Sequence, residues 1–209
     1  MKKYSILLFF ILIVPGFICG STPHHAGSPD PMVSFLKEYL DIKYNGARFE
    51  TFIYVAAKRQ RLYLISNDTV VKTFEISTAE KGIGNLSGSY QTPEGLHKIA
   101  EKVGDDLPIN TVIKSKIATG EQVDPILEPK SNNRDLITTR VLHLKGLEDG
   151  VNAGENKDSY SRGIFIHGTH EEGLLGIAAS KGCVRMANKD VIELYDSVEV
   201  GTFVIILNN

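Results

Sequence analysis

The sequence lacks an excess of basic residues and any apolar run long enough to cross a bilayer as a helix. It has 23 lysines and arginines against 25 aspartates and glutamates, a formal net charge of -2 at pH 7. Because proteins that bind nucleic acid usually carry a basic patch, we expect no nucleic-acid partner. No internal repeat is evident, and 209 residues are enough for one domain with a core and an additional N-terminal segment.

Residues 1–20 have the layout of a secretory signal peptide. Lys2 and Lys3 precede an unbroken apolar run over residues 6–14, and small residues follow around Gly20. That run is too short to span a membrane. We therefore expect an exported protein of the periplasm or cell envelope, from which residues 1–20 are removed. The alternative is a retained segment that tethers the protein peripherally to the membrane through its N-terminus.

Cysteine is scarce, since the chain has only Cys19 and Cys183. Cleavage after Gly20 would discard Cys19, and bulky Ile18 fits a lipid-modified cysteine poorly, although lipidation there is an alternative. Cys183 would then be the single thiol of a protein in an oxidising compartment, where thiols usually pair. The alternative to a functional thiol is a small buried apolar side chain.

Residues 21–49 are expected to form a flexible leader followed by one amphipathic helix. Residues 21–30 are polar and contain two prolines, and His24 and His25 in this stretch are interpreted as part of a solvated tail. Asp30 and Pro31 then suit the N-cap and first position of a helix over residues 31–43. Apolar residues recur at helical spacing within it: Met32, Phe35, Leu36, Tyr39 and Leu40. We expect this face to dock on the main domain, with a partner-binding helix as the alternative.

Residues 50–208 are expected to form one domain of short strands. Runs at 52–57, 62–66 and 70–76 predict a three-stranded antiparallel meander. Further strand-like runs cover 96–100, 138–144, 163–167 and 203–207. Asn188 is predicted to cap a helix over 189–198. The fold class is therefore all-β or β-rich, a sandwich or barrel with a few short helices.

The densest group of chemically useful residues lies between positions 160 and 190. A strand ends at His167 with Gly168 after it, and a loop leads to Gly182 and Cys183. A cysteine attacks as thiolate, and a histidine can take its proton and pass it to a leaving amine. Gly182 would allow close approach of a substrate backbone, and N–H groups near Cys183 can form an oxyanion hole. Spacing alone does not establish that the two side chains meet.

This stretch resembles the catalytic motif of the L,D-transpeptidase (YkuD-type) family. That motif has His-Gly, a loop, Ser/Thr-x-Gly-Cys and then often Arg-Met or Arg-Leu. The chain has His167-Gly168-Thr169, Ser180-Lys181-Gly182-Cys183 and Val184-Arg185-Met186. Thr92-Pro93-Glu94-Gly95 is similar to the family's Thr-Pro-x-Gly turn. The resemblance covers about residues 50–207 and implies a sandwich-like L,D-transpeptidase catalytic domain.

The resemblance also implies a role for each residue of the motif. Cys183 would be the nucleophile and His167 the general base and acid, with the Gly168 carbonyl orienting the imidazole. Arg185 would bind a carboxylate of the peptide stem or steady the active-site loop. The substrate-binding turn would include Ser180, which shapes it, Gly182 and Lys181. Lys181 stands where the family often has histidine, and it could favour the Cys183 thiolate by charge.

The implied reaction is acyl transfer on the peptide stems of peptidoglycan, without a metal or organic cofactor, by a chain we expect to be monomeric. The alternatives are an L,D-carboxypeptidase, a hydrolase that detaches proteins from the wall, or a wall-binding module without catalysis. His170 together with His167 and Cys183 could instead suggest zinc, but a fourth ligand is missing. Glu171 and Glu172 are expected at a solvated loop tip, with a place lining the donor cleft as the alternative, and His143 is expected within a strand.

Overall fold

The computed structural model describes residues 30–45 and 49–209. In chain order its elements are α1 (Pro31–Lys43), β1 (Thr51–Ala56), β2 (Arg61–Ser66), β3 (Thr69–Ser77), β4 (Gly95–Val103), β5 (Thr111–Lys114), β6 (Ile117–Gln122), β7 (Ile137–Gly146), η1 (Glu155–Lys157), β8 (Phe165–Thr169), η2 (Glu172–Leu174), β9 (Val184–Met186), α2 (Asn188–Ser197) and β10 (Phe203–Leu207). The prediction of a β-rich fold with few helices is confirmed.

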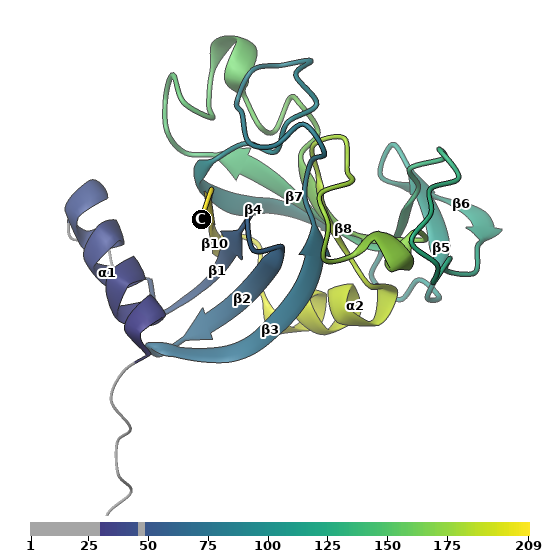
Figure 1. The fold of residues 1–209 in the computed structure, drawn as a ribbon, viewed down its shortest axis with the longest axis horizontal. Coiled ribbons are helices and arrows are strands. Elements are labelled where there is room, and N and C mark those ends of the chain that lie inside the picture. The colour runs from purple at the N-terminus through teal and green to yellow at the C-terminus, as the bar shows by residue number, and fades with distance from the viewer. Residues whose placement is uncertain (1–29, 46–48) are drawn as a thin grey trace, which may run out of the picture.

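All of these strands belong to one sheet that closes on itself. Its order is β4-β10-β1-β2-β3-β9-β8-β7-β5-β6, and an additional β4–β7 pairing joins the two ends of the main sheet. The β5–β6 hairpin extends from β7 and projects to one side (Figure 1). Closure removes exposed edges from the main strands. The predicted three-stranded meander corresponds to β1, β2 and β3, which pair in antiparallel fashion.

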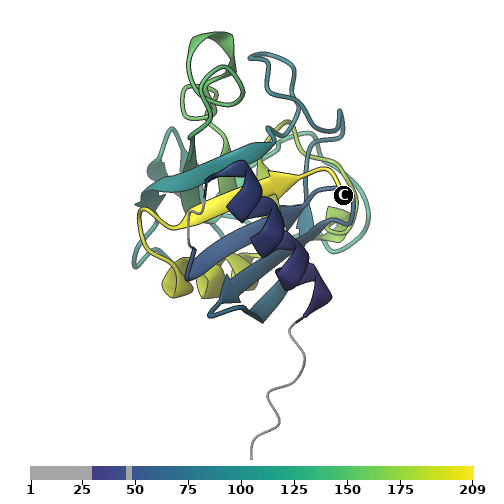
Figure 2. The same cartoon turned by 90° about the vertical axis from the view of Figure 1, so that its left-hand side faces the viewer.

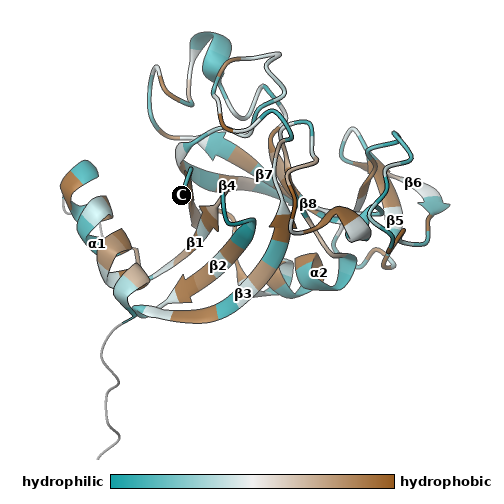
Figure 3. Cartoon of the chain, viewed as in Figure 1, coloured by the Kyte–Doolittle hydropathy of each residue, from teal (hydrophilic) through white to brown (hydrophobic). Residues whose placement is uncertain are grey.

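The main core lies on the concave side of this closed sheet. Alternate residues of the strands contribute to it, including Leu142 and Leu144 of β7 and Ile166 of β8. Helix α2 adds Val191 and Leu194 to the same cluster. Most of the apolar colour in Figure 3 accordingly lies on the strands. Because side chains alternate along a strand, the residues between these core positions face the other side of the sheet.

Helix α1 packs on the outer surface of β1 and β10, where it forms a second apolar cluster (Figure 2). It begins where the sequence predicts, with the Asp30 carboxylate accepting the Met32 N–H at 2.8 Å. Its buried residues are Val33, Leu36 and Leu40, whereas Phe35, which we expected on the docking face, is 56% exposed. Leu36 and Leu40 belong to both the predicted and the observed face, and the buried stripe is turned toward Val33 and away from Phe35.

Glu148, in the connection after β7, binds the C-terminal end of α1 and links it to the sheet. Its carboxylate accepts the Tyr44 hydroxyl at 2.8 Å and lies 3.0 Å from the Lys43 ammonium. The same carboxylate accepts the Leu96 N–H of β4. These contacts explain why the helix is held against the domain at its C-terminal end as well as by its apolar face.

Two sequence predictions about the elements are wrong in detail. Strand β8 continues through Gly168 and Thr169, which remain paired with β7, so His167 lies in the middle of the strand and not at its end. Asn188 does not cap α2. Its side-chain oxygen accepts the hydroxyls of Thr138 and Thr139, and its amide donates to the Thr169 carbonyl at 2.7 Å, so that it joins the helix to β7 and β8.

The predicted signal peptide, Cys19 and the leader up to residue 29 lie outside the described residues. Within residues 30–45 and 49–209, no helix has the length and apolar character needed to span a membrane.

Candidate active site

The parallel pairing of β8 and β9 brings the predicted nucleophile and base onto one surface. Ile166 pairs with Val184 and His167 with Arg185. Cys183 immediately precedes β9 and is level with Phe165. Because Ile166 and Val184 are both in the main core, the alternating residues Cys183, His167 and Arg185 face the opposite side. Cys183 and His167 are therefore diagonal neighbours on adjacent strands.

His167 is buried and has a single defined tautomer. Its Nδ1 lies 2.8 Å from the Gly168 carbonyl oxygen, which can only accept, so Nδ1 carries the proton and Nε2 has a free lone pair. Burial lowers the pKa of His167 to about 4, and the nearby Arg185 cation acts in the same direction. The imidazole is consequently neutral at pH 7 and able to take a proton.

Gly168 makes this arrangement compatible with the surrounding backbone. A Cβ at this position would lie 2.6 Å from the Thr138 carbonyl oxygen and 2.9 Å from Oδ1 of Asn188. Any side chain would therefore separate β8 from β7 and shift the carbonyl that orients the imidazole.

The Cys183 thiol rests among backbone groups of the segment before β8. Its Sγ accepts the Phe165 N–H at 3.4 Å and donates to the Gly163 carbonyl at 3.5 Å. Burial raises the pKa of Cys183 to about 11, although the Phe165 N–H and the Arg185 and Arg162 cations favour the thiolate. The thiol is thus protonated at rest. It is bonded to the Gly163 carbonyl and not to His167.

The turn before Cys183 is held by Ser180. The Ser180 hydroxyl donates to the Cys183 carbonyl at 2.6 Å and accepts the Gly182 N–H at 3.2 Å. Between them Gly182 has φ +134°, a conformation that other residues rarely adopt. Ser180 therefore has the turn-shaping position that the sequence predicts, and Gly182 provides the backbone conformation that the turn requires.

Arg185 is buried within a network of carboxylates. Its side chain is 2% exposed, and its guanidinium donates to Glu171 Oε2 at 3.0 Å and to Asp135. Of the two predicted roles, this geometry favours steadying the loops around the site, because the guanidinium is already paired and withdrawn from the surface. Asp135 comes from the long connection between β6 and β7, and Glu171 follows β8 directly.

The expectation of a solvated loop tip at Glu171 is wrong. Its side chain is 1% exposed, and beyond Arg185 it accepts the Ser131 hydroxyl at 2.6 Å and the Asn132 N–H at 2.9 Å. A buried arginine in the apolar strand Val184–Met186 requires a carboxylate partner, and that requirement was the available signal in the sequence. Nothing in the spacing, however, distinguishes Glu171 or Asp135 from other acidic residues.

Lys181 lies at the rim of the site. Its side chain is 62% exposed, and the ammonium lies 3.8 Å from Asp135 Oδ2. The main cations that lower the pKa of Cys183 are Arg185 and Arg162. Lys181 remains accessible to a ligand.

Arg162 is a feature of the site that the sequence analysis missed. It donates to the carbonyls of Asn85 at 2.9 Å and Gln91 at 2.7 Å, which fixes the glycine-rich loop over residues 82–92. Its half-buried cation is close enough to influence the thiol of Cys183. Arg162 immediately precedes Gly163, whose carbonyl accepts the thiol, so one short segment both anchors the loop and contacts Cys183.

The remaining histidines of this region have other partners. His170 Nε2 is 2.9 Å from the Asn132 side-chain oxygen, and His143 lies within β7, stacked on Tyr160. Among residues 30–45 and 49–209, no group of three or more histidines, cysteines and acidic residues is arranged to hold a metal ion. What the arrangement offers chemically is a protonated thiol beside a neutral, oriented imidazole.

Comparison with known proteins agrees with the motif and decides the family. The model of the YkuD family, described as the L,D-transpeptidase catalytic domain, matches residues 50–206. The chain belongs to the L,D-transpeptidase catalytic-domain family. The matched range contains the Ser180–Cys183 turn, His167 and all the strands of the sheet except Leu207, the last residue of β10.

Individual relatives of this L,D-transpeptidase domain are distant. The chain is 29% identical over 153 residues to the probable L,D-transpeptidase ErfK/SrfK of Salmonella typhimurium, a match that covers 69% of this chain and 47% of the relative. The chain thus spans about half the length of the curated relatives it matches. An L,D-transpeptidase structure from Mycobacterium smegmatis aligns with TM-score 0.46 at 16% identity, over 78% of this chain and 60% of the other. One from Mycobacterium tuberculosis aligns with TM-score 0.47 at 14% identity, over 76% and 58%.

Proposed function

We propose that this chain is a cysteine-dependent L,D-transpeptidase that crosslinks peptidoglycan by acyl transfer from a tetrapeptide stem through a thioester at Cys183. The observation that carries the proposal is the parallel register of β8 and β9, which presents Cys183 and His167 on one face of the sheet. Membership of the family supplies the class of reaction. The geometry supports the assignment of the individual roles.

In the first step His167 would act as base. The resting pair is neutral, since the pKa of the thiol is raised to about 11 and that of the imidazole lowered to about 4. Sγ would attack the carbonyl that joins an L-centre to the terminal D-residue while Nε2 takes the thiol proton. The imidazolium would then give this proton to the leaving amine, and the D-amino acid would depart. The Nδ1–H to Gly168 bond holds the ring in place throughout.

In the second step an amine of another stem would attack the thioester. It would lose a proton to Nε2, and Sγ would leave as a thiol after recovering that proton. Water in place of the amine would give an L,D-carboxypeptidase, so the acceptor alone separates crosslinking from hydrolysis. None of these steps requires a metal or organic cofactor.

The test is product analysis with a purified disaccharide tetrapeptide. We expect crosslinked dimers and release of the terminal D-residue with the unsubstituted protein, and neither with Cys183→Ala. His167→Ala should also abolish turnover while the chain remains folded. Tripeptide products without dimers would assign the protein as a carboxypeptidase. Equal dimer yield from Cys183→Ala would exclude the proposed nucleophile.

We further propose that the protein acts as a monomer outside the cytoplasmic membrane. This rests on the sequence of residues 1–20 and on the cell-wall substrate that the reaction requires. Fractionation of cells that express the full chain should place it in the envelope, and light scattering should give the mass of one chain. Recovery in the cytoplasm with residues 1–20 intact would contradict the export.

A further inference from the structure

Two lysines face each other across neighbouring strands on the same outer surface as the proposed nucleophile. In the β4–β7 pairing Lys98 is directly opposite Lys145. The next outward-facing pair along these strands is Glu101 opposite His143. The neighbouring pair Ile99 and Leu144 belongs to the main core, so the lysines face outward. Like charges placed directly opposite one another on a sheet are unfavourable.

No carboxylate of the described part of the chain forms an ion pair with either cation, although Asp158 is near enough to Lys145 for the two charges to interact. Neither Lys98 nor Lys145 takes part in an ion pair or side-chain hydrogen bond with residues 30–45 or 49–209. Glu101, the nearby carboxylate, is already bonded by Lys116 at 2.6 Å and by the Tyr160 hydroxyl. With Lys116 and Asp158 included, the group has three cations and two anions, and an excess of one positive charge remains beside the two lysines.

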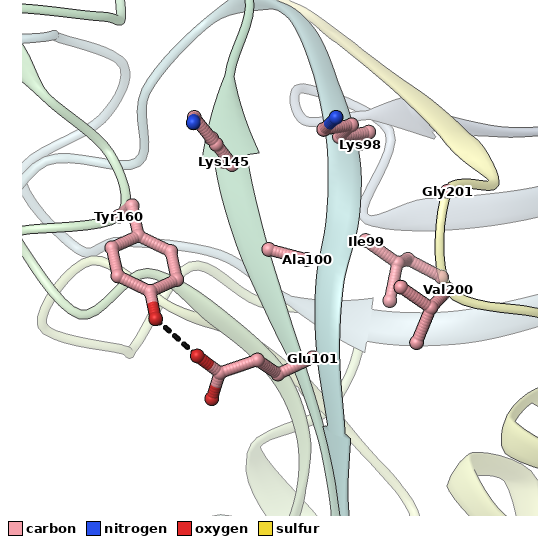
Figure 4. Close-up of a pocket in the computed structure, with 8 residues that line it drawn as sticks. All are labelled: Lys98, Ile99, Ala100, Glu101, Lys145, Tyr160, Val200 and Gly201. Atoms are coloured by element: carbon pink, nitrogen blue, oxygen red, sulfur yellow. Dashed lines mark hydrogen bonds between the residues drawn. The ribbon is translucent and has the colours of Figure 1, made fainter.

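The lysines line a pocket with a volume of about 340 Å³ (Figure 4). Figure 4 shows them on neighbouring strands, with Tyr160 directed toward Glu101 on one side. Val200 and Gly201 close the other side. The pocket therefore combines two ammonium groups that are in no ion pair with an aromatic wall, which is a combination suited to a peptide that carries a carboxylate.

An aromatic ridge connects this pocket with the proposed nucleophile. Tyr160 stacks on His143 with ring centroids 4.0 Å apart, and His143 meets Phe165 edge to face at 4.7 Å. The Phe165 N–H in turn donates to Cys183 Sγ. Lys145 is two residues from His143 along β7, and Cys183 lies two strands across the sheet from His143. The Cα atoms of Lys145 and Cys183 are therefore about 12 Å apart. The three residues on the acyl side of the scissile bond span about 10 Å when extended, and the flexible lysine side chains can cover the remaining gap.

We propose that Lys98 and Lys145 form an anion-binding subsite for a carboxylate of the peptide whose acyl group is transferred at Cys183. The inference deepens the proposed function and rests on it for the identity of the peptide. With its scissile carbonyl at Sγ, the peptide would lie along the ridge and bring an upstream carboxylate between the two ammonium groups. The ligand would then relieve a repulsion that the fold otherwise maintains.

The test measures peptide binding with the full chain carrying Cys183→Ala, so that turnover does not interfere. The probes are a synthetic tetrapeptide stem with free side-chain carboxylates and the same peptide with those groups amidated. The variant is Lys98→Gln/Lys145→Gln. The matched control, Lys58→Gln/Lys189→Gln, removes the same charge from two exposed lysines that do not line the pocket.

We expect the Lys98→Gln/Lys145→Gln variant to raise the Kd of the free-carboxylate peptide at least tenfold and to leave the Kd of the amidated peptide unchanged. The control variant should bind both peptides as the parent does, and Lys98→Arg/Lys145→Arg should restore binding. With Cys183 intact, KM for the free-carboxylate donor should rise while kcat stays within twofold. The melting temperature should stay constant or rise, since a like-charge pair is removed.

Equal Kd values for the pocket and control variants would overturn the inference, and so would equal losses for free and amidated peptides. Binding of polyglycerol phosphate but not of the peptide at these lysines would assign the pocket to a phosphate polymer and also refute it. If the double variant fails to fold, Lys145→Gln alone, at an exposed position, serves instead. Absence of any acyl adduct at Cys183 with active protein would refute the proposed function separately, because the binding measurements do not require chemistry.

Discussion

Replacement of Glu171 by glutamine gives the sharpest test of how the site is held together. Glu171 and Arg185 are 1% and 2% exposed and are joined by a 3.0 Å bond, so this is a buried pair. Glutamine can keep the contacts with the Ser131 hydroxyl and the Asn132 N–H through its oxygen. Its amide group would then face the Arg185 guanidinium, donor against donor, and leave a buried cation with Asp135 as its remaining partner.

The expected loss of stability follows from this geometry. Removal of one partner of a buried pair costs about 3–5 kcal/mol, and the retained Asp135 contact places the Glu171→Gln variant near the lower end, at about 3 kcal/mol. With a urea m-value of about 2 kcal/mol/M, the midpoint should fall by roughly 1.5 M. In thermal unfolding the same loss corresponds to roughly 10 °C for a chain of this size.

Urea unfolding followed by far-UV circular dichroism measures this change. Glu128→Gln is the matched control, because Glu128 pairs with Lys130 at the surface, where both side chains are mostly exposed. Such surface pairs contribute about 0–1 kcal/mol. If the urea midpoint of Glu171→Gln lies within about 0.3 M of the Glu128→Gln midpoint, the pair contributes no more than a surface ion pair does. That result would refute the view that this pair holds the loops around the site.

Three further outcomes follow from the site. Gly182→Ala should cost about 1–2 kcal/mol in urea unfolding and slow acylation, because φ is +134° at that position, and an unchanged midpoint would contradict it. The pKa of Cys183 is raised to about 11, so its alkylation rate with iodoacetamide should keep rising above pH 9 and not level off there. Burial lowers the pKa values of His97 and His167 to about 4, below the unfolded 6.5. As pH falls from 6.5 to 4 the unfolded chain binds protons first, and unfolding free energy should fall by roughly 3 kcal/mol for each histidine; a flat profile would refute this.

The sequence predicts the local elements well where periodicity and turn chemistry are strong. Helix α1 follows from Asp30, Pro31 and the apolar spacing, and β10 from a continuous apolar run, because these signals depend on neighbouring residues only. Closure of the sheet through β4–β7 could not be predicted in this way. That pairing joins segments about 45 residues apart, and nothing in the sequence of either strand specifies its partner.

Prediction of the site was limited for the same reason. Cys183, His167, Gly168 and Ser180 could be proposed as site residues because they form a compact motif around two strands. Three further residues reach the site through contacts that cross long stretches of chain: Asp135, Glu171 and Arg162. Their residue types are common in solvated loops, so the sequence does not single them out. Asn188 shows how this misleads, since a residue type suited to a cap is instead engaged with Thr138 and Thr139.

The central claim is that Cys183 carries the acyl group with His167 as its base. Intact-protein mass spectrometry during incubation with a disaccharide tetrapeptide, followed by peptide mapping, tests it most directly. We predict an adduct equal to the donor less its terminal D-residue, located on Cys183, and formed far more slowly in His167→Ala. An adduct on another residue, or product formation by Cys183→Ala at the parent rate, would contradict the claim.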